Sequence, residues 1–319
     1  MSGSAREVAA ALAERDAFIL TSHARPDGDA IGSSMALAYA LDAIGKRVRV
    51  LLADPVPMPY LPFPGLDRIE FTDHAEGAAD AAVLLECGEL TRPGIAGLDK
   101  YFIVNVDHHV GNAMYGQVNW FDTSACACGE MVAEIIDALG VSWSSDLAAH
   151  LYLAIVTDTG GLRYGPITAR TFEICRRIAA TGIEPAQLTR QIFDSFSIGR
   201  VKITGALLNG MELLHHNRVA MLYFDDALLA SCGATIDDTE GLVNLPLNAR
   251  EVVAVALLKR QDASTVRVSL RSKGDVDVRS VAARWQGGGH RNAAGCTITA
   301  PIEEIKRHLS AAIGEQLTS

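Results

Sequence analysis

Eight acidic and imidazole side chains of this sequence lie at the ends of apolar runs or in the turns that follow them. In the clearest case, the mostly apolar run 102–106 ends abruptly in Asp107, His108 and His109. A run that is apolar on both faces is typical of a buried strand in a parallel sheet. Ligands of such sheets bind beyond the carboxyl ends of the strands. The complete set is His23, Asp27, Asp29, Glu86, Asp107, His108, His109 and Asp158.

The residue types in this set favour a metal site. Carboxylates gathered at one sheet edge repel one another strongly unless cations lie between them. Oxygen ligands with one or two imidazoles favour Mn²⁺, with Mg²⁺ or Co²⁺ as substitutes, over Ca²⁺ or a thiolate-rich zinc site. The set is large enough for two ions, and paired ions can clamp the oxygens of an in-line phosphoryl displacement.

Each part of the pattern also has a purely structural alternative. Asp27 and Asp29 lie beside proline and glycine and have the residue type of turn acids. Asp158, which precedes Thr-Gly-Gly, fits an Asx turn. The joint placement of the acids after buried apolar runs favours the metal site over these alternatives.

The elements that must position these residues predict an α/β fold. Short apolar runs alternate with helical periodicities up to about residue 196, which is the pattern of a doubly wound, mostly parallel sheet. Strand-like runs lie closer together after about residue 215 and predict a smaller α+β domain. We expect a first domain over 1–197, a connector helix over 198–215 and a second domain over 216–319. The expected strands are 17–21, 47–52, 79–85, 101–106, 218–224, 252–258 and 266–270, and the expected helices include 4–16, 30–44, 124–139, 145–156, 168–181, 185–196 and 301–316.

Composition and charge exclude several classes of protein. The 319-residue chain is 49% hydrophobic and 21% charged, as in compact domains rather than disordered chains. Its net charge of −10 and its aromatic content of 6% argue against binding of long nucleic acids. No apolar run reaches the roughly 20 residues of a membrane helix, and residues 1–16 lack a signal-peptide core, so we expect a cytoplasmic protein without membrane contact. The six scattered cysteines are expected to be reduced and structural.

In order and spacing, these residues resemble the motifs of the DHH phosphoesterase superfamily. The four matching motifs are His23-x-x-x-Asp27-x-Asp29, the acid at 86, Asp107-His108-His109 and Asp158. Residues 287–295 resemble the signature of the DHH-associated C-terminal domain, so the resemblance extends over nearly the whole chain. The length of the chain and residues 268–272 are similar to the nanoRNase/pAp-phosphatase branch, the NrnA type.

This resemblance implies two metal sites in the first domain. His23 and Asp27 would bind one ion, whereas Asp29, His108 and Asp158 would bind the other. Glu86 would bridge both ions. Asp107 would orient His108, and His109 would contact the scissile phosphate and stabilise its charge or the leaving oxygen.

Glu86 is the one departure from the family pattern, which usually has aspartate at this motif. Glutamate is longer by one methylene but still offers two oxygens, so it can bridge after a small adjustment of the backbone. Glu89 is a competing acid, but it lies further from the end of the strand.

The second domain is expected to bind the substrate. Three consecutive glycines allow backbone N–H groups to approach a phosphate or a base, and Arg271 offers a bidentate phosphate contact. A tight turn between a helix and a strand is the structural alternative for the glycines. The expected binding residues are Arg271, Ser272, Gly288, Gly289, His290, Arg291 and Asn292.

The resemblance predicts hydrolysis of very short RNA to nucleoside 5′-monophosphates with Mn²⁺, and removal of the 3′-phosphate from pAp. The substrate would bind between the two domains, so short oligoribonucleotides and pAp would be the partners and long duplex nucleic acid would not. One alternative is a phosphodiesterase for linear or cyclic signalling dinucleotides such as pApA or pGpG. Another, from a different class, is a non-catalytic nucleotide-binding regulator, which Glu86 would permit. The sequence leaves both a monomer and a homodimer open.

Overall fold

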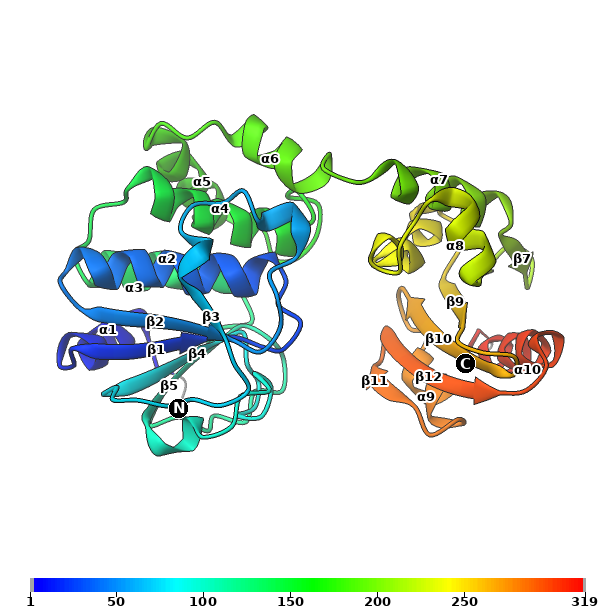
Figure 1. Ribbon diagram of the computed structural model, residues 1–319, viewed down its shortest axis with the longest axis horizontal. Coiled ribbons are helices and arrows are strands. Elements are labelled where there is room, and N and C mark those ends of the chain that lie inside the picture. Colours follow the sequence, from blue (N-terminus) through cyan, green and yellow to red (C-terminus); the bar gives the residue numbers. More distant parts are fainter. Residues whose placement is uncertain (1–2, 318–319) are drawn as a thin grey trace. The chain divides into compact units, whose positions relative to one another are not determined.

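The protein divides into two units, Met1–Ser195 and Phe196–Ser319, in a computed structural model that describes residues 3–317 (Figure 1). Each unit is built around a sheet of its own. The first unit is α/β and the second is α+β, so the expected fold class is confirmed.

Within the described residues, the first unit contains a six-stranded sheet in which all neighbours pair in parallel. The strand order is β3-β2-β1-β4-β5-β6, so the chain winds outward from β1 and then, from β4, in the opposite direction. The carboxyl ends of β1, β4 and β5 therefore lie side by side at one edge of the sheet. The strands are β1 (Ala17–Thr21), β2 (Arg47–Leu52), β3 (Ile69–Phe71), β4 (Ala81–Leu85), β5 (Phe102–Asp107) and β6 (Val118–Phe121).

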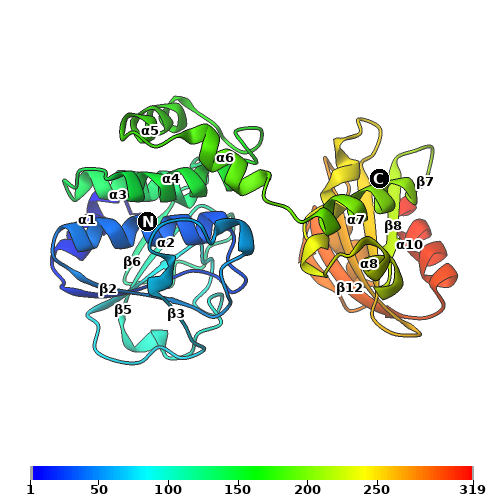
Figure 2. The same cartoon turned by 45° about the horizontal axis from the view of Figure 1, so that its top comes forward.

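Both faces of this sheet are buried, but by different kinds of structure. Alternate residues of a strand point to opposite faces. In β5, Val104 and Val106 pack into the core beneath the helices, whereas Ile103 packs into a second core that is formed mainly by strands and loops. Figure 2 shows the helices α1 to α4 on one side of the sheet, where α4 packs mainly against α2 and α3 rather than against the strands. The helices of this unit are α1 (Ala5–Ala13), α2 (Gly28–Ala43), α3 (Cys128–Ala138), α4 (Ser145–Asp158), α5 (Ala169–Ala180) and α6 (Pro185–Phe193).

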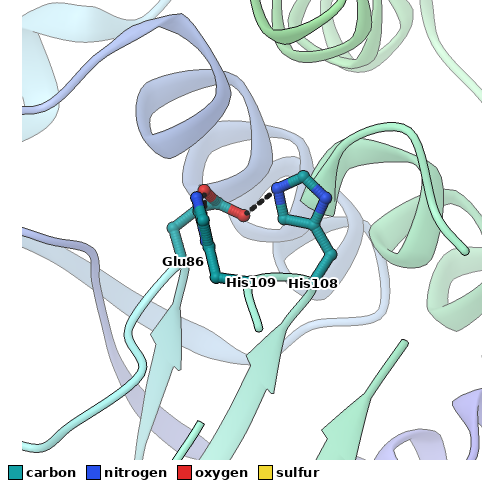
Figure 3. Close-up of side chains that lie close together, drawn as sticks. All are labelled: Glu86, His108 and His109. Carbon is teal, nitrogen blue, oxygen red and sulfur yellow. Dashed lines mark ion pairs between the residues drawn. The ribbon is translucent and has the colours of Figure 1, made fainter. Parts of the chain in front are cut away.

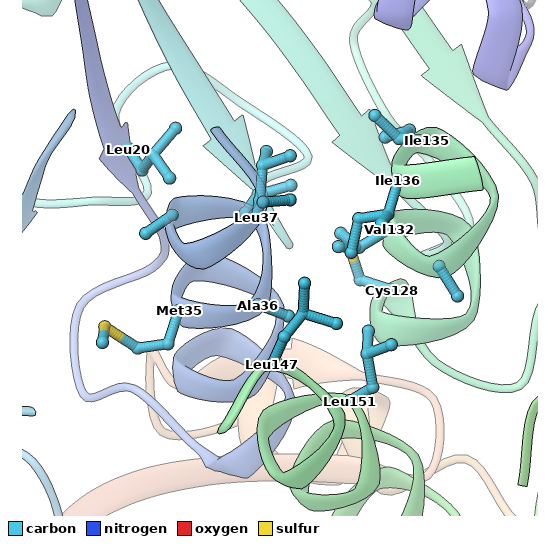
Figure 4. Close-up of a cluster of buried hydrophobic side chains, with 14 of the residues drawn as sticks. Leu20, Met35, Ala36, Leu37, Cys128, Val132, Ile135, Ile136, Leu147 and Leu151 are labelled. Atoms are coloured by element: carbon cyan, nitrogen blue, oxygen red, sulfur yellow. The ribbon is translucent and has the colours of Figure 1, made fainter. Parts of the chain in front are cut away.

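Glycines allow α2, α3 and α4 to pack closely. A Cβ at Gly32 of α2 would lie 2.4 Å from the carbonyl oxygen of His150 on α4. A Cβ at Gly129 of α3 would lie 2.4 Å from the Cβ of Ala154 on α4. Apolar side chains of the three helices then fill the core, as Figure 4 shows for Leu37. Because any larger residue would push these helices apart, the glycines determine where the residues at the helix ends lie.

The sequence missed the two edge strands of this sheet. β3 has only three residues and β6 has four, and the burial of both is incomplete, so neither has a clear hydrophobic pattern. The expected helix 124–139 begins instead at Cys128, because Asp122 accepts hydrogen bonds from Ser124 in the turn that precedes it.

The second unit contains, within the described residues, a six-stranded mixed sheet in the order β11-β12-β10-β9-β8-β7. β8 and β9 pair in parallel and the other neighbours are antiparallel. Its strands are β7 (Glu212–Leu214), β8 (Val219–Phe224), β9 (Ala254–Arg260), β10 (Thr265–Ser272), β11 (Gly288–His290) and β12 (Ala293–Thr299). Its helices are α7 (Ile198–Asn209), α8 (Asp226–Cys232), α9 (Val278–Ala283) and α10 (Ile302–Gln316).

The expected helix over 198–215 is shorter than the sequence suggested. α7 ends at Asn209 because Gly210 follows, and Glu212–Leu214 pair with β8 as a strand. Ile203 and Leu207 of α7 belong to a hydrophobic core of the second unit. This helix is therefore part of that unit rather than a free connector.

No helix within residues 3–317 is both long enough and apolar enough to span a bilayer.

His150 on α4 provides a test of this packing. It is fully buried, its Nε2 lies 2.8 Å from the carbonyl oxygen of Pro64, and its ring stacks on Tyr39. Burial lowers the pKa of His150 from 6.5 to about 4. The unfolded chain binds a proton between these two values and the folded chain does not, so stability falls as the pH falls through this window.

We expect His150→Gln to remove this part of the pH dependence. The native protein should lose about 3 kcal/mol more than the variant between about pH 7 and pH 4, at about 1.4 kcal/mol per pH unit. Urea unfolding of both proteins at the two pH values measures the difference. An equal pH dependence in the two proteins would contradict this account of His150.

Candidate metal centre

His108 is the point at which four elements of the first unit converge. Its Nε2 lies 3.3 Å from Oε1 of Glu86, 3.6 Å from Oδ2 of Asp158 and 3.8 Å from Oδ2 of Asp29. Glu86 follows β4 and His108 follows β5, as Figure 3 shows. Asp29 lies in the first turn of α2, and Asp158 is the last residue of α4. The structure therefore brings together four of the residues that the sequence singled out.

Asp29 is held in place by the beginning of α3. Its Oδ2 accepts a hydrogen bond from the N–H of Cys128 at 2.6 Å, and its Oδ1 accepts one from the N–H of Gly129 at 3.0 Å. The hydroxyl of Ser33 donates a third hydrogen bond at 2.7 Å. The first N–H groups of a helix lack partners within the helix and attract negative charge. They can thus stabilise a carboxylate that is almost completely buried.

The ring of His108 is oriented by a backbone carbonyl group. Its Nδ1 lies 3.1 Å from the oxygen of Ala125, so Nδ1–H donates and Nε2 faces the carboxylates. The buried Glu130 holds this segment, because its Oε2 accepts a hydrogen bond from the N–H of Cys126 and its Oε1 accepts one from the hydroxyl of Thr171. The chain thereby presents Nε2 of His108 as a metal ligand.

Two buried atoms at the centre of the cluster have no hydrogen-bond partner among the described residues: Nε2 of His108 and Oε1 of Glu86. Leaving a buried polar atom unpaired costs on the order of 1–3 kcal/mol. Both atoms face the same space, 3.3 Å apart. A cation that coordinates both would satisfy them, so the donor set fits a metal ion.

The charges of the cluster support the same conclusion. Although burial opposes its charged form, Glu86 and Asp29 raise the pKa of His108 to about 10. Burial, together with Glu86 and Asp27, raises the pKa of Asp158 to about 6. Burial and the neighbouring Glu86 and Asp158 hold the pKa of Asp29 well above its ordinary value. The cluster therefore needs positive charge, from either protons or a cation.

Two groups of three side chains within residues 3–317 have ligand atoms that all lie within 4.8 Å of one another. One group is Glu86, His108 and His109, and the other is Asp29, His108 and Asp158. Both combine carboxylate and imidazole donors without a thiolate, as divalent ions such as Mn²⁺ prefer. His108 belongs to both groups, so the two candidate ligand sets share this residue.

Glu86 has an unusual backbone conformation. Its φ of 62° lies in the left-handed region, which costs a residue other than glycine roughly 1–2 kcal/mol. With this turn, Oε1 faces His108 while Oε2 lies 3.5 Å from Nδ1 of His109. The competing acid, Glu89, is exposed. Glu86 is therefore the acid that lies in the cluster.

The expectation that Asp107 orients His108 is wrong. Oδ1 of Asp107 accepts hydrogen bonds from the backbone N–H and Nδ1 of His109, at 3.1 and 2.9 Å. Asp107 lies on the face of β5 that also carries Ile103, and His108 points to the opposite, helical face. The alternation along the strand thus gives each histidine a different partner.

His23 and Asp27 form a pair of their own beside this cluster. Nε2 of His23 lies 3.8 Å from Oδ1 of Asp27, and Nδ1 lies 3.0 Å from the carbonyl oxygen of Ala24. Burial opposes the charged form of His23, but Asp27 raises its pKa. Asp27 also caps α2 by accepting a hydrogen bond from the N–H of Ala30. Among the described residues, neither side chain belongs to the two groups of three ligands.

In the second unit, three of the expected substrate-binding residues stabilise a loop. Asn292 Nδ2 donates to Oγ of Ser272 at 2.9 Å, and that hydroxyl donates to the carbonyl of Val276 at 2.7 Å. Arg291 donates to the carbonyl of Asp275 at 2.8 Å. These contacts connect the end of β10 to the residues that follow β11.

The other expected residues of this unit have different surroundings. Gly288 and Gly289 pair with β12 as part of β11, rather than forming a tight turn. Arg271 is half-buried, and its Nη1 donates to the carbonyl of Leu270 at 2.9 Å. The side chain of His290 lies outside the part of the chain that the structure describes.

Sequence reasoning missed the groups that hold the ligands. The carbonyl of Ala125 and the N–H groups of Cys128 and Gly129 belong to the backbone, so no residue type marks them. Glu130 had a usable signal, because an acid within the apolar face of a helix needs a partner.

Comparison with known proteins shows the family of this chain. The DHH family, N-terminal domain, matches residues 17–155, and the DHHA1 domain matches residues 225–318. The chain belongs to the DHH phosphoesterase family, whose members are metal-dependent hydrolases. The resemblance that the motifs indicated is thereby confirmed.

Among named relatives, the chain is similar to the bifunctional oligoribonuclease and PAP phosphatase NrnA of Thermus thermophilus. The two are 30% identical over 302 residues, which cover 94% of this chain and 90% of that protein. The protein of the same name from Bacillus subtilis is 28% identical over 291 residues, with coverages of 89% and 90%. A crystal structure of an exopolyphosphatase-related protein from Bacteroides fragilis has a TM-score of 0.89 at 24% identity, with coverages of 98% and 95%, which concerns the fold alone.

Replacing Asp158 by asparagine should separate the destabilising repulsion within this charge cluster from the ability of the cluster to bind a metal ion. Without divalent ions, Asp158→Asn should be at least as stable as the native protein, because one of three adjacent carboxylates is neutralised. With Mn²⁺ at 100 times its dissociation constant, the native protein should gain about 2.7 kcal/mol. The variant should gain much less, because it lacks a charged ligand.

Thermal unfolding with EDTA and with Mn²⁺ measures both effects. Asp99→Asn, which alters an exposed acid of the same unit, is the matched control and should gain as much from Mn²⁺ as the native protein. If Asp158→Asn gained as much as Asp99→Asn, Asp158 would not be a ligand.

Proposed function

We propose that this protein hydrolyses very short RNA oligonucleotides to nucleoside 5′-monophosphates with Mn²⁺ and also removes the 3′-phosphate of pAp. The observation that carries the proposal is the convergence of Glu86, Asp29 and Asp158 on Nε2 of His108. The names of relatives that match the chain over nearly its whole length supply the class of substrate.

The proposed ligand sets hold two ions in the first unit. His23 and Asp27 bind one ion, and Asp29, His108 and Asp158 bind the other. Glu86 is proposed to bridge both ions: its Oε1 lies 3.3 Å from Nε2 of His108, and its charge also acts on His23, whose pKa it helps to raise. When bound, such ions lower the pKa of a water molecule and neutralise the charge of the phosphate.

His109 is proposed to act on the substrate directly. Its side chain is 55% exposed, in contrast to the buried side chain of Asp107 that accepts its hydrogen bond. This hydrogen bond raises the pKa of His109, so the ring holds a proton more firmly. With Nδ1 engaged by Asp107, Nε2 is the nitrogen that can donate a proton or a hydrogen bond to the phosphate or the leaving oxygen.

The second unit is proposed to bind the substrate through Arg271. Ser272, Arg291 and Asn292 are proposed to support this site through the loop that they stabilise. Arg271 bonds to a carbonyl group rather than to a carboxylate, so its charge is available for a phosphate. Gly288, Gly289 and His290 are proposed to contribute backbone or ring contacts from β11. An overall charge of −10 suits a short substrate that needs only a few cationic contacts.

Hydrolysis of labelled nucleotides with Mn²⁺ tests the activity. We expect AMP to be released from pApA and from pAp, and longer RNA to be cleaved more slowly. The control is the double variant Asp107→Ala/His108→Ala, which lacks a proposed ligand and the acid that holds His109. Turnover by the native protein no higher than that of this variant would refute the proposal.

The same panel of substrates separates the alternatives. A preference for pGpG or for cyclic dinucleotides over pApA and pAp would favour a phosphodiesterase of signalling dinucleotides. Tight nucleotide binding without turnover and without bound metal would favour a regulator.

Arg271→Ala tests the role of the second unit. Removing a charged hydrogen bond to a phosphate should raise the KM for pApA by about tenfold or more, because such bonds contribute roughly 1.5–3 kcal/mol. Arg267→Ala is the matched control, since Arg267 lies on the same face of β10 and is exposed. Equal KM values for the two variants would show that Arg271 does not bind the substrate.

A further inference from the structure

The carbonyl oxygen of Cys87, directly after Glu86, accepts hydrogen bonds from three side chains. Nδ2 of Asn105 and the hydroxyl of Tyr115 both lie 2.9 Å away, and Nδ2 of Asn112 lies 3.3 Å away. A carbonyl oxygen has two lone pairs, so three donors saturate it. Asn105 is fully buried within β5, where a polar side chain needs a reason to be present.

Asn112 also connects this turn to the acid that holds His109. Its Nδ2 donates to Oδ2 of Asp107 at 2.7 Å, and its Oδ1 accepts the N–H of Met114 at 2.8 Å. The other oxygen of Asp107 accepts the two hydrogen bonds from His109. One amide group therefore contacts both the Glu86–Cys87 turn and the Asp107–His109 pair.

Hydrogen bonds also fix the backbone on both sides of Glu86. The N–H of Glu86 donates to the carbonyl of Val106 at 3.1 Å, and the hydroxyl of Ser22 donates to the carbonyl of Leu85 at 2.8 Å. After the turn, the N–H of Ala113 donates to the carbonyl of Gly88 at 2.8 Å. A left-handed residue that is not glycine persists only where its surroundings over-determine it. These contacts supply that constraint.

We propose that Asn112 and Tyr115 are positioning residues, which hold the carboxylate of Glu86 and the ring of His109 at the spacing that metal binding and phosphoester hydrolysis need. This inference rests on the proposed function, because it assigns the network a role through a metal ligand. Neither residue lies among the side chains placed in contact with metal or substrate. A purely structural network would affect stability but leave the metal affinity of the folded protein unchanged.

The test compares Asn112→Ala and Tyr115→Phe with Asn119→Ala. Asn119 is a matched control because, within the described residues, its side-chain amide forms hydrogen bonds with the backbone of Gly116 alone, at 2.9 and 2.6 Å. Calorimetric titration with Mn²⁺ gives the affinity of each folded protein, and thermal unfolding without metal gives its stability. Hydrolysis of pApA gives kcat and KM separately.

We expect Asn112→Ala to weaken Mn²⁺ binding by about 10–100-fold, as is usual for groups that orient metal ligands. Tyr115→Phe should weaken it less, because the hydrogen bonds of Asn112 to both Cys87 and Asp107 remain. Both should lower kcat more than they raise KM, and Asn119→Ala should bind Mn²⁺ like the native protein.

An Mn²⁺ affinity of Asn112→Ala equal to that of Asn119→Ala would overturn the inference, whatever the change in stability. If Asn112→Ala does not fold, Tyr115→Phe decides, and native affinity in that variant would overturn it. A native protein that binds Mn²⁺ with the expected dependence on Asn112, but releases no nucleotide from pApA or pAp, would contradict the proposed function and support the positioning role.

Discussion

The repulsion between buried carboxylates at one edge of a parallel sheet is the constraint on which the first unit depends. Asp29, Glu86 and Asp158 lie within 4 Å of a single imidazole nitrogen, and two of these acids are almost completely buried. Like charges at this spacing oppose folding unless a positive group compensates them. The fold supplies part of that compensation through the N–H groups that begin α3, and a divalent ion is suited to supply the rest.

The surrounding structure can be understood as a frame for these charges. α2 and α4 carry one acid each, and the absence of a side chain at Gly32 brings the two helices close enough for the acids to meet. α3 contributes backbone groups at its beginning, while Glu130 orders the segment before it. The strands contribute their carboxyl ends. The strand order, in which β4 lies between β1 and β5, brings the ends of these strands together.

The sequence predicted the meeting of Asp29, Glu86, His108 and Asp158, since each follows an apolar run or turn and parallel strands end at the same edge. It did not predict the partner of Asp107. A run that is apolar on both faces does not reveal which face the helices cover, so the directions of residues 107 and 108 stayed undetermined. The edge strands β3 and β6 were missed because three or four partly exposed residues carry no periodicity. The groups that orient His108 belong to the backbone and leave no trace in residue types.

The two halves of the candidate metal centre are held in place by different kinds of contact. Asp29 and Asp158 are attached to helices in direct backbone contact, so they can shift only if the packing of the whole helical layer changes. Glu86 and His109 are attached to turns that are connected to each other by side-chain amides and a phenol. These turns are held by a few side-chain hydrogen bonds instead of by backbone packing. Single side-chain substitutions can therefore disturb the side of Glu86 and His109, whereas a change on the helical side requires the helices themselves to repack.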